Sequence, residues 1–402
     1  MKKQEENVTS KEHNQPDGRH RKHTELVRPS LGNYGRNEWA IVGAPCVFIK
    51  ALADQVIHAL SPTYKCAYAD TSHNDEIVLA PGRLANGAFL EYTDQINHRQ
   101  FNYDGKPTAF KLRQQFNDAD LVLVNGNHQQ AKAQVVIIYN TKATSLRKRL
   151  SQLTNVELIL IAENTNDVFD FIKEALPGWE NIPQCRLDET EKIIAFFESK
   201  MQQAKPVLNG LVLAGGKSVR MGYDKGTVKW FGKEQRYHVA DMLRPLCRDV
   251  FISCRAEQKS QIISGYPVLE DTFTGLGPFG AILSAFREQP DKAWLVVACD
   301  LPLLETDTFK FLIRQRKISA IATAFNSPDN EFPEPLITIW EPKSYPVLLS
   351  FLAQGYSCPR KVLINSDVNL IQAPDTTALT NVNTPDDLEK VKRTIHQKIA
   401  SA

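Results

Sequence analysis

A glycine pair followed by spaced cations marks the stretch LVLAGGKSVRMGYDKG, residues 211–226. An apolar run leads into Gly215 and Gly216, and glycine lets consecutive backbone N–H groups come close to an anion. The cations that follow would neutralise a triphosphate and then a leaving pyrophosphate; they are Lys217, Arg220 and Lys225. The spacing fits neither the G-x-x-x-x-G-K-S/T loop nor G-x-G-x-x-G. A tight turn with surface lysines is the simpler alternative, but the apolar run and the cations together favour a nucleotide site.

A carboxylate stands at the end of another apolar run, VVACDLP, residues 296–302. Ligands of open parallel sheets bind outside the carboxyl ends of the strands, which is where this run would place Asp300. Mg²⁺ typically takes one or two carboxylates together with substrate phosphates, so Asp300 is a candidate metal ligand. Its alternative role is to cap the next segment. The neighbouring Cys299 is expected to be a buried structural thiol rather than a nucleophile.

Two further segments place polar groups at turns. In VLEDTFTGLGPFGAIL, residues 268–283, Asp271 follows a short apolar run, and glycines that include Gly277 precede a helix. Such a turn lies against a ribose or a base in a nucleotide site, or it is only a flexible connection. In NVNTP, Asn381 and Asn383 stand at a helix start, where they either cap the helix or hydrogen-bond a polar substrate.

The elements that position these residues alternate between apolar strands and amphipathic helices in both halves of the 402-residue chain. This alternation predicts an α/β fold with parallel sheets, organised as two Rossmann-like three-layer domains. We expect a disordered tail at residues 1–37, a first domain at 38–204 and a second at 205–402. The tail is expected because its few apolar side chains cannot offset the entropy lost on ordering.

The apolar runs that predict strands are distributed along both domains. They are AIVG, CAYAD, DLVLVNG, QVVIIYN and VELILIAEN in the first, then LVLAGG, DVFISC, AWLVVACD, SAIATAF and PLITIW in the second. Thr384 is expected to cap the last helix, with Pro385 in its first turn.

Composition excludes several classes of protein. Lys+Arg 48 against Asp+Glu 46 gives a net charge of +2, which does not support binding to nucleic acid or to a membrane surface. No apolar run approaches the roughly 20 residues that span a bilayer. Seven scattered cysteines do not form a disulfide framework, so we expect a reducing, cytoplasmic setting.

The stretch LAGGKSVRMGYDKG resembles the LAGGxSxRMGxDK signature of molybdenum cofactor guanylyltransferases, the MobA family. The order of VLED, TGLGPFGAIL, CDLP, PEPLITIW and NVNTPDDL is similar to that family too, from Asn209 to about Arg393. The resemblance implies a nucleotidyltransferase fold of the nucleotide-diphospho-sugar transferase type. It implies Mg²⁺-dependent transfer of GMP from GTP to the phosphate of molybdopterin or the molybdenum cofactor, with release of pyrophosphate.

The resemblance also implies roles for individual residues. Lys225 and Arg220 would bind the phosphates, Asp271 would bind GTP and Asp300 would hold Mg²⁺. The nucleotide would touch Leu213, Ala214, Gly215 and Gly216, with Gly277 in the turn that faces it, and Asn381 and Asn383 would face molybdopterin. Family members often have Asn after the strand DVFIS, where this chain has Ser253, so that nucleotide contact differs.

The first domain resembles the small GTP-binding adaptor of the same pathway, the MobB family. The resemblance rests on AIVGAPCVFIKALADQVIHAL, ADTSHND and DLVLVNGNHQQAKAQVVII. A working P-loop needs glycine and a lysine before Ser/Thr, whereas this chain has Pro45, Phe48 and Ile49 there. We therefore predict no GTP hydrolysis in this domain, and a binding or docking role. A polar patch is also predicted, from Asp70, His73, Asn125 and His128.

Three functions stay open. A guanylyltransferase is favoured because LAGG carries the small residue that makes room for guanine, whereas cytidylyltransferases on the same cofactor usually read LAAG. The third is a catalytically silent protein that carries the cofactor to insertion proteins or molybdoenzymes. The intact Lys225 and Asp300 favour an enzyme over a carrier.

Overall fold

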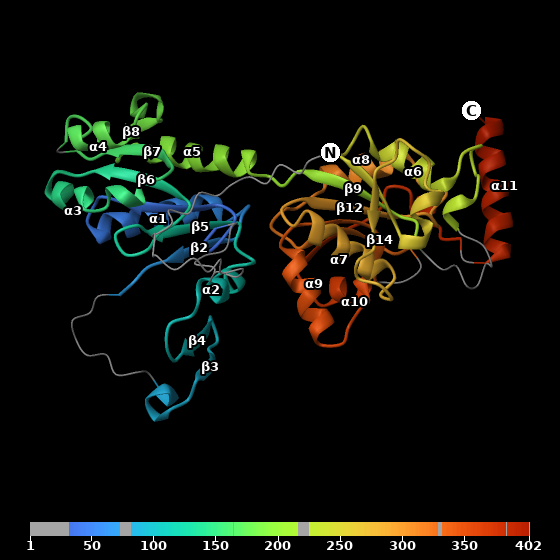
Figure 1. Ribbon diagram of the computed structural model, residues 1–402, viewed down its shortest axis with the longest axis horizontal. Helices are drawn as coiled ribbons and strands as arrows, with labels where there is room; N and C mark the ends of the chain where they lie inside the picture. Colours follow the sequence, from blue (N-terminus) through green and yellow to red (C-terminus); the bar gives the residue numbers. More distant parts are fainter. Residues whose placement is uncertain are drawn as a thin grey trace, which may run out of the picture.

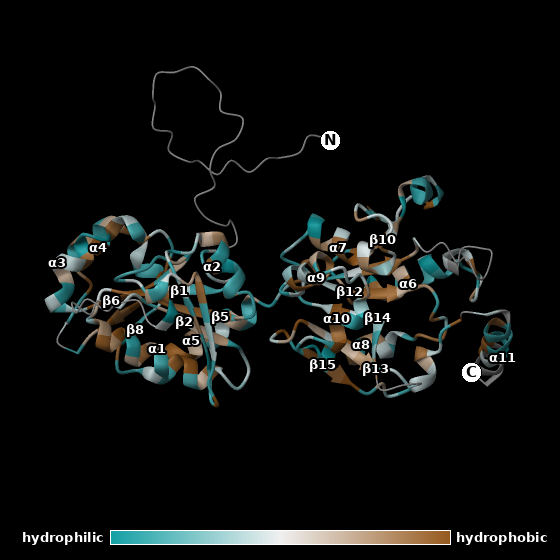
Figure 2. Cartoon of the chain, turned by 90° about the horizontal axis from the view of Figure 1, so that it is seen from below, coloured by the Kyte–Doolittle hydropathy of each residue, from teal (hydrophilic) through white to brown (hydrophobic). Residues whose placement is uncertain are grey.

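The computed structural model describes residues 32–72, 82–163, 165–215, 225–328, 332–382 and 384–401. Two β-sheets organise the chain, one before and one after the helix α5 (Figure 1). We call the described residues up to Gln203 the N-terminal half and those from Val207 onward the C-terminal half. The strands of both sheets carry much of the hydrophobic colour in Figure 2.

Six parallel strands form the sheet of the N-terminal half, in the order β2-β5-β1-β6-β7-β8. In chain order they are β1 (Glu38–Val42), β2 (Cys66–Ala69), β5 (Leu121–Asn125), β6 (Ala133–Ile138), β7 (Val156–Ile161) and β8 (Gln184–Arg186). Successive side chains of a strand point to opposite faces. Ile41 and Leu123 therefore pack on one face, and Val42 and Val124 on the other.

Helices cover both faces of this sheet and make three layers. One face packs against α1 (Cys46–Leu60) and α5 (Thr190–Gln203). The other packs against α2 (Ala109–Gln115), α3 (Ala143–Arg147) and α4 (Asp170–Ala175). Short 3₁₀ turns complete the half; they are η1 (Gly82–Asn86), η2 (Asn140–Lys142), η3 (Leu150–Gln152) and η4 (Trp179–Asn181). An antiparallel hairpin stands apart from the sheet, β3 (Leu90–Asp94) with β4 (Arg99–Tyr103) (Figure 1).

Seven strands form the sheet of the C-terminal half, in the order β11-β10-β9-β12-β14-β13-β15. In chain order they are β9 (Leu208–Leu213), β10 (Val250–Cys254), β11 (Val268–Glu270), β12 (Ala293–Ala298), β13 (Ala322–Asn326), β14 (Pro333–Trp340) and β15 (Val368–Ile371). The α/β fold with parallel strands is confirmed, with one exception. β14 runs antiparallel to β12 and β13 because no helix separates it from β13, and two strands joined by a short loop pair antiparallel.

Helices also cover both faces of the second sheet. α6 (Gln235–Leu243) and α8 (Thr306–Arg314) lie on one face, and α7 (Pro278–Glu288), α9 (Ser344–Ala353) and α10 (Pro359–Ile364) lie on the other. The remaining elements are η5 (Lys225–Thr227), η6 (Ala256–Gln261), η7 (Thr376–Leu379) and the last helix, α11 (Pro385–Ser401). Thr384 caps α11 as expected, since its Oγ1 accepts the Asp387 N–H at 3.2 Å. None of the described helices has the length and apolar character that crossing a membrane requires.

The last residues assigned to the tail belong to the folded protein. Glu38 is buried, and its carboxylate accepts the backbone N–H groups of Asn33, Tyr34 and Gly35 at 2.9, 2.7 and 3.0 Å. Tyr34 is buried against the sheet. A buried carboxylate needs donors, and this turn supplies them, so residues 32–37 are ordered rather than part of a tail. Residues 1–31 lie outside the described residues.

The amino-terminal ends of the parallel strands in one sheet face those in the other sheet. Asp120 precedes β5, Pro206 precedes β9, and Lys343 follows the antiparallel strand β14, yet all three line one cavity. The carboxyl edges of the two sheets therefore point away from each other along the long axis in Figure 1. A ligand at one carboxyl edge is out of reach of the other within a single chain.

Candidate active site

Four parallel strands of the C-terminal half end at one edge of its sheet. β9, β10, β11 and β12 lie in neighbouring positions and run in the same direction, so their carboxyl ends meet. The residues that follow them include Gly215, Arg255, Asp271 and Asp300. Ligands of open α/β sheets bind outside this edge, so these residues define the candidate site.

The carboxyl group of Asp271 lies beside the ends of β10 and β9. Ser253 Oγ donates a hydrogen bond to Asp271 Oδ1 at 2.5 Å, and the Asp271 N–H donates to the Cys254 carbonyl at 3.0 Å. A Cβ on Gly215 would lie 2.9 Å from Asp271 Oδ2, so an alanine there would displace the carboxylate. Burial raises the pKa of Asp271 to about 6, although the Ser253 hydroxyl and the Arg255 guanidinium act in the opposite direction. The site thus holds a half-buried acceptor for a ligand N–H or O–H.

The glycine-rich turn after Asp271 is tied to α7 by Ser284. The Ser284 hydroxyl accepts the backbone N–H groups of Thr272 and Phe273 at 2.9 and 3.2 Å, and donates to the Gly280 carbonyl at 2.7 Å. Gly277 precedes α7 with a φ of 58°, a left-handed conformation that favours glycine. The turn is therefore a fixed wall of the site rather than a flexible connection.

Asp300 joins the same edge to the segment before α11. Its side chain is half-buried, and its backbone carbonyl accepts the Val382 N–H at 2.9 Å. This hydrogen bond brings the half-buried Asn381 to the same edge. Gln235 Nε2 donates to the backbone carbonyl of Leu301, the residue after Asp300, at 3.5 Å.

The chemistry of the donors at this edge suits a metal that shares its ligands with a substrate. Within the described part of the chain, no three His, Cys, Asp or Glu side chains are grouped so as to hold a metal by themselves. Mg²⁺ is commonly bound by one or two carboxylates with substrate phosphates completing its shell. Asp300 supplies a carboxylate of that kind, so the residues present fit the ion.

The predicted site residues are described only in part. Leu213 ends β9 at the edge, Ala214 and Gly215 follow it, and the Ala214 N–H donates to the Ser253 carbonyl at 3.0 Å. Lys225 is the first residue of η5. Gly216, Lys217, Arg220, His73 and Asn383 lie outside the described residues. Cys299, beside Asp300, is buried, as expected for a structural thiol.

Arg255 and Gln235 belong to the site although the sequence does not point to them. Arg255 is the first residue after β10, and its charge lowers the pKa of Asp271. A cation directly after a predicted strand is a signal that could have identified it. Gln235 is fully buried, and its Oε1 has no hydrogen-bond partner within the part of the chain that the structure describes. At the start of an amphipathic helix it looks like an ordinary surface residue, so no sequence signal marks it.

The matching edge of the N-terminal half does not have P-loop geometry. Gly43 adopts a φ of 101°, and Pro45, which has no N–H, precedes α1. The Asn127 Nδ2 group donates to the Ala44 carbonyl at 2.8 Å. Cys46 Sγ lies 3.2 Å from His128 Nε2. The turn is thus contacted by Asn127 and His128, which follow β5, where a P-loop would present N–H groups to phosphates.

Two members of the predicted polar patch come together beside this turn. Asp70 Oδ1 accepts the Thr71 N–H at 2.7 Å, and Oδ2 accepts the Tyr68 hydroxyl at 3.1 Å. Burial raises the pKa of Asp70, but the neighbouring Asn125 amide, the hydrogen bonds from Thr71 and Tyr68 and the charge of Lys50 together lower it by more, so the net shift is downward. Asp70 and Asn125 thus lie near each other, while His128 lies against Cys46.

Comparison with known proteins finds a family match over the segment that contains this candidate site. Residues 210–368 match the MobA-like NTP transferase domain. The fold and the site of the C-terminal half thus define a nucleotidyltransferase domain.

Relatives that this chain matches over nearly their whole length show the family to which it belongs. A molybdenum cofactor guanylyltransferase from Pseudomonas putida is 31% identical over 202 residues, which are 47% of this chain and 100% of that protein. One from Shewanella baltica is 30% identical over 190 residues, 46% of this chain and 95% of that protein. The chain belongs to the molybdenum cofactor guanylyltransferase family.

Two other proteins are also similar to this chain, one over part of its own length and one at lower sequence identity. A molybdenum cofactor biosynthesis bifunctional protein from Synechocystis sp. is 32% identical over 201 residues, 50% of this chain but only 58% of that protein. The crystal structure of molybdopterin-guanine dinucleotide biosynthesis protein A from Archaeoglobus fulgidus is 22% identical, with a TM-score of 0.41, over 47% of this chain and 99% of that one.

Proposed function

We propose that the C-terminal half transfers GMP from GTP to the phosphate of molybdopterin or the molybdenum cofactor. The proposal rests on the meeting of Asp271 and Asp300 at one sheet edge, where β9, the strand that leads into LAGG, also ends. A phosphate oxygen of the acceptor attacks the α-phosphorus of GTP, the bond to the bridging oxygen breaks, and pyrophosphate leaves. The attacking phosphate is already anionic, so the reaction needs positioning and charge neutralisation rather than a strong base.

Each residue of the site has a proposed role in this reaction. Lys225 and Arg220 neutralise the phosphates, and the backbone from Leu213 to Gly216 approaches the nucleotide. Asp271, oriented by Ser253, accepts hydrogen bonds from GTP, and the turn at Gly277 closes that side. Mg²⁺ held by Asp300 would neutralise the phosphate oxygens. Asn381 and Asn383 face the acceptor.

Gly215 supports guanine as the base. Cytidylyltransferases on the same cofactor usually have alanine at this position of the loop. In this chain the Cβ of an alanine would come within 2.9 Å of Asp271 Oδ2. Glycine therefore allows Asp271 to stay at the site, where a carboxylate pairs well with the adjacent N–H donors of guanine.

The experiment is pyrophosphate release by the purified chain with GTP, Mg²⁺ and molybdopterin, comparing Asp300→Asn with Asp307→Asn. Asp307 is an exposed carboxylate in the first turn of α8 and serves as the control. We expect Asp300→Asn to lower kcat at least about a hundredfold, the size of effect that follows loss of one charge-stabilising group. A carrier without activity would release no pyrophosphate in any form, yet would bind the cofactor equally well in both variants.

We also propose that the chain divides into domains at 38–204 and 205–402, with the ordered turn at residues 32–37 packed on the first. The first domain is proposed to dock molybdopterin-handling partners such as insertion proteins or molybdoenzymes. It is proposed not to hydrolyse GTP, because Pro45 and Asn127 occupy the position where a P-loop would bind phosphates. Calorimetric titration of the full chain with Mg²⁺–GTP then gives one site per chain. Two tight sites would contradict this part of the proposal.

A further inference from the structure

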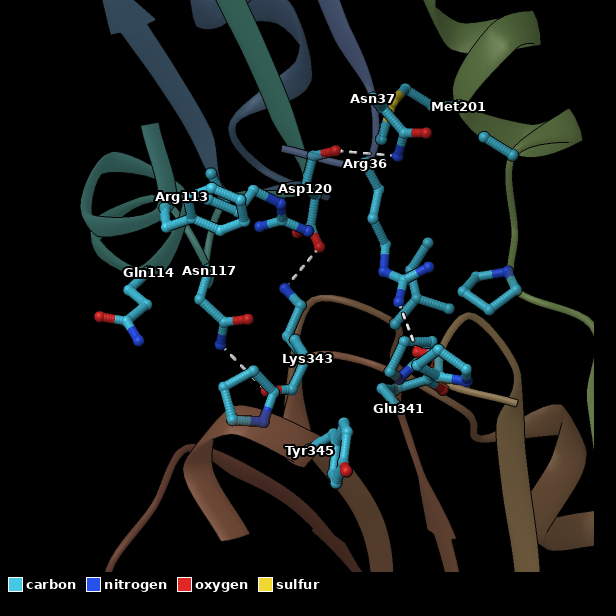
Figure 3. Close-up of a pocket in the computed structure, with 18 residues that line it drawn as sticks. Arg36, Asn37, Arg113, Gln114, Asn117, Asp120, Met201, Glu341, Lys343 and Tyr345 are labelled. Carbon is cyan, nitrogen blue, oxygen red and sulfur yellow. Dashed lines mark hydrogen bonds and ion pairs between the residues drawn. The ribbon is translucent and has the colours of Figure 1, made fainter. Parts of the chain in front are cut away.

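A cavity of about 460 Å³ lies between the two halves, on the side of each sheet opposite its carboxyl edge (Figure 3). The N-terminal half contributes residues that precede β1 and β5 and residues of α2. The C-terminal half contributes residues that precede β12 and follow β14. This volume lies within the range of about 300–1,000 Å³ that small-molecule sites occupy.

Two ion pairs at this cavity are complete. Lys343 Nζ lies 2.6 Å from Asp120 Oδ1, and both side chains are buried. Arg316 donates from Nε and NH2 to the two carboxylate oxygens of Glu341 at 2.6 and 2.8 Å, and both side chains are buried. These four charges cancel in pairs, so they leave no net charge in the cavity.

Two other cations at the cavity have no carboxylate partner among the described residues. Arg36 donates from NH2 to the Pro290 carbonyl at 2.6 Å, and Arg113 donates from NH1 to the Tyr34 carbonyl at 3.2 Å. Among the described residues, no carboxylate lies within 4.0 Å of either guanidinium. Burial and the charge of Arg113 together lower the pKa of Arg36 to about 10, although Asp291 and Glu341 act in the opposite direction. Burial lowers the pKa of Arg113 as well, and the charge of Glu38 only partly offsets this. Half-buried cations that repel one another are stabilised by an anion between them.

The remaining wall of the cavity is largely apolar. It includes the rings of Phe110 and Tyr345 and the side chains of Met201, Pro290 and Pro342. Figure 3 shows Arg36 and Arg113 on the side of the N-terminal half and Tyr345 opposite them. A ligand that suits this lining has one anionic group and a flat, apolar body.

We propose that this cavity binds a small aromatic anion, with its phosphate or carboxylate between Arg36 and Arg113 and its ring against Tyr345 and Phe110. The guanidinium group carries five donors in a planar fork, and toward the residues that the structure describes each of these arginines uses one of them, on a backbone carbonyl. An oxyanion would accept several of the others. The site is distinct from the proposed transfer site, because it lies at the amino edges of the sheets.

The test is titration calorimetry on the full chain with three probes of one size: phenyl phosphate, benzoate and the neutral benzamide. At least one anion should bind with a Kd of about 1 mM or tighter, and benzamide should not bind. The anion that binds with the lower Kd identifies the headgroup that the site prefers. Arg36→Gln and Arg113→Gln should each weaken binding by about tenfold or more, the effect of losing a charged hydrogen bond. Arg99→Gln, on the exposed strand β4, should leave it unchanged.

Saturating GTP separates this site from the transfer site. Binding should persist in the presence of GTP, whereas displacement by GTP would place the anion at the transfer edge and overturn the proposal. Absence of binding by both anions would overturn it as well, and so would binding that both glutamine variants retain. If either variant fails to fold, the decisive experiment is a crystal of the natural chain soaked in 4-bromobenzoate or in 4-bromophenyl phosphate, according to which headgroup binds more tightly in the calorimetry. A bromine anomalous peak beside Tyr345 supports the site, and a crystal without one refutes it.

Discussion

Ser253 and Asp271 are joined side chain to side chain across β10 and β11, with Ser253 Oγ 2.5 Å from Asp271 Oδ1. Ser253 thus uses its hydroxyl to orient a carboxylate. Because Gly215 carries no side chain, the second carboxylate oxygen stays in place beside β9. The contact expected between Ser253 and the nucleotide thus becomes, in our account, a contact made through Asp271.

The pKa of Asp271, about 6, predicts a pH dependence of GTP use. If the ionised carboxylate accepts from GTP, kcat/KM rises with pH through a midpoint near 6. In Ser253→Ala this midpoint should move upward by about one unit, because a hydrogen bond that favours the charged form is lost. The exposed Ser260→Ala is the control, and its profile should match that of the natural chain. An unshifted midpoint in Ser253→Ala would show that the hydroxyl does not support the carboxylate.

The same shift has an effect on stability. The pKa of Asp271 in the folded state lies above its unfolded value of about 3.9, so the folded chain holds this proton more tightly. Its contribution to the free energy of unfolding is therefore present below about pH 4 and is lost as pH rises through about 6. In Asp271→Asn, urea denaturation between pH 4 and 7 should show a smaller fall in stability than in the natural chain. An identical fall in the two proteins would be the contrary result.

Gly215→Ala should reduce kcat/KM for GTP by at least about tenfold, since its Cβ would lie 2.9 Å from Asp271 Oδ2 and displace the acceptor. Gly35→Ala is a matched control in the other half, where the Cβ would meet a methyl group of Val122 at 2.9 Å. That change should cost stability and leave kcat/KM of the folded enzyme unchanged. Full activity in Gly215→Ala would refute the proposed position of the nucleotide. A switch from GTP to CTP in this variant would support the assignment of the base.

Lys343→Met should destabilise the chain by about 3–5 kcal/mol, because it leaves the buried carboxylate of Asp120 without its cation. The double variant Lys343→Met with Asp120→Asn should recover most of that loss, since the amide can still accept the Lys65 N–H. Lys65→Met removes an exposed ion pair with Asp367 and should cost at most about 1 kcal/mol. Urea denaturation measures all three. A loss below 1 kcal/mol in Lys343→Met would mean that the halves are not held together by this pair.

Much of the fold follows from local pattern. The runs DLVLVNG and AWLVVACD become the buried strands β5 and β12, because continuous apolar side chains suit a strand covered on both faces. Parallel alternation then places the residues after β9, β11 and β12 at one edge. The convergence of Gly215, Asp271 and Asp300 was predictable for that reason.

Other features depend on contacts between distant segments. The direction of β14 is set by a short loop after β13, and the turn at residues 32–37 by donors gathered on the buried Glu38. The proximity of Arg255 to Asp271 depends on the pairing of β10 with β11. The hairpin of β3 and β4 has mostly exposed residues, so hydrophobic periodicity does not mark it. Such relationships cannot be read from spacing along the chain.

The central claim is tested most directly by supplying the purified chain with Mg²⁺ and molybdopterin, together with either GTP or CTP, and measuring pyrophosphate and the dinucleotide product. The account predicts pyrophosphate with GTP, a product heavier than molybdopterin by the GMP group, and loss of both in Lys225→Ala and in Asp300→Asn. Preference for CTP, or bound GTP that is never turned over, would contradict it.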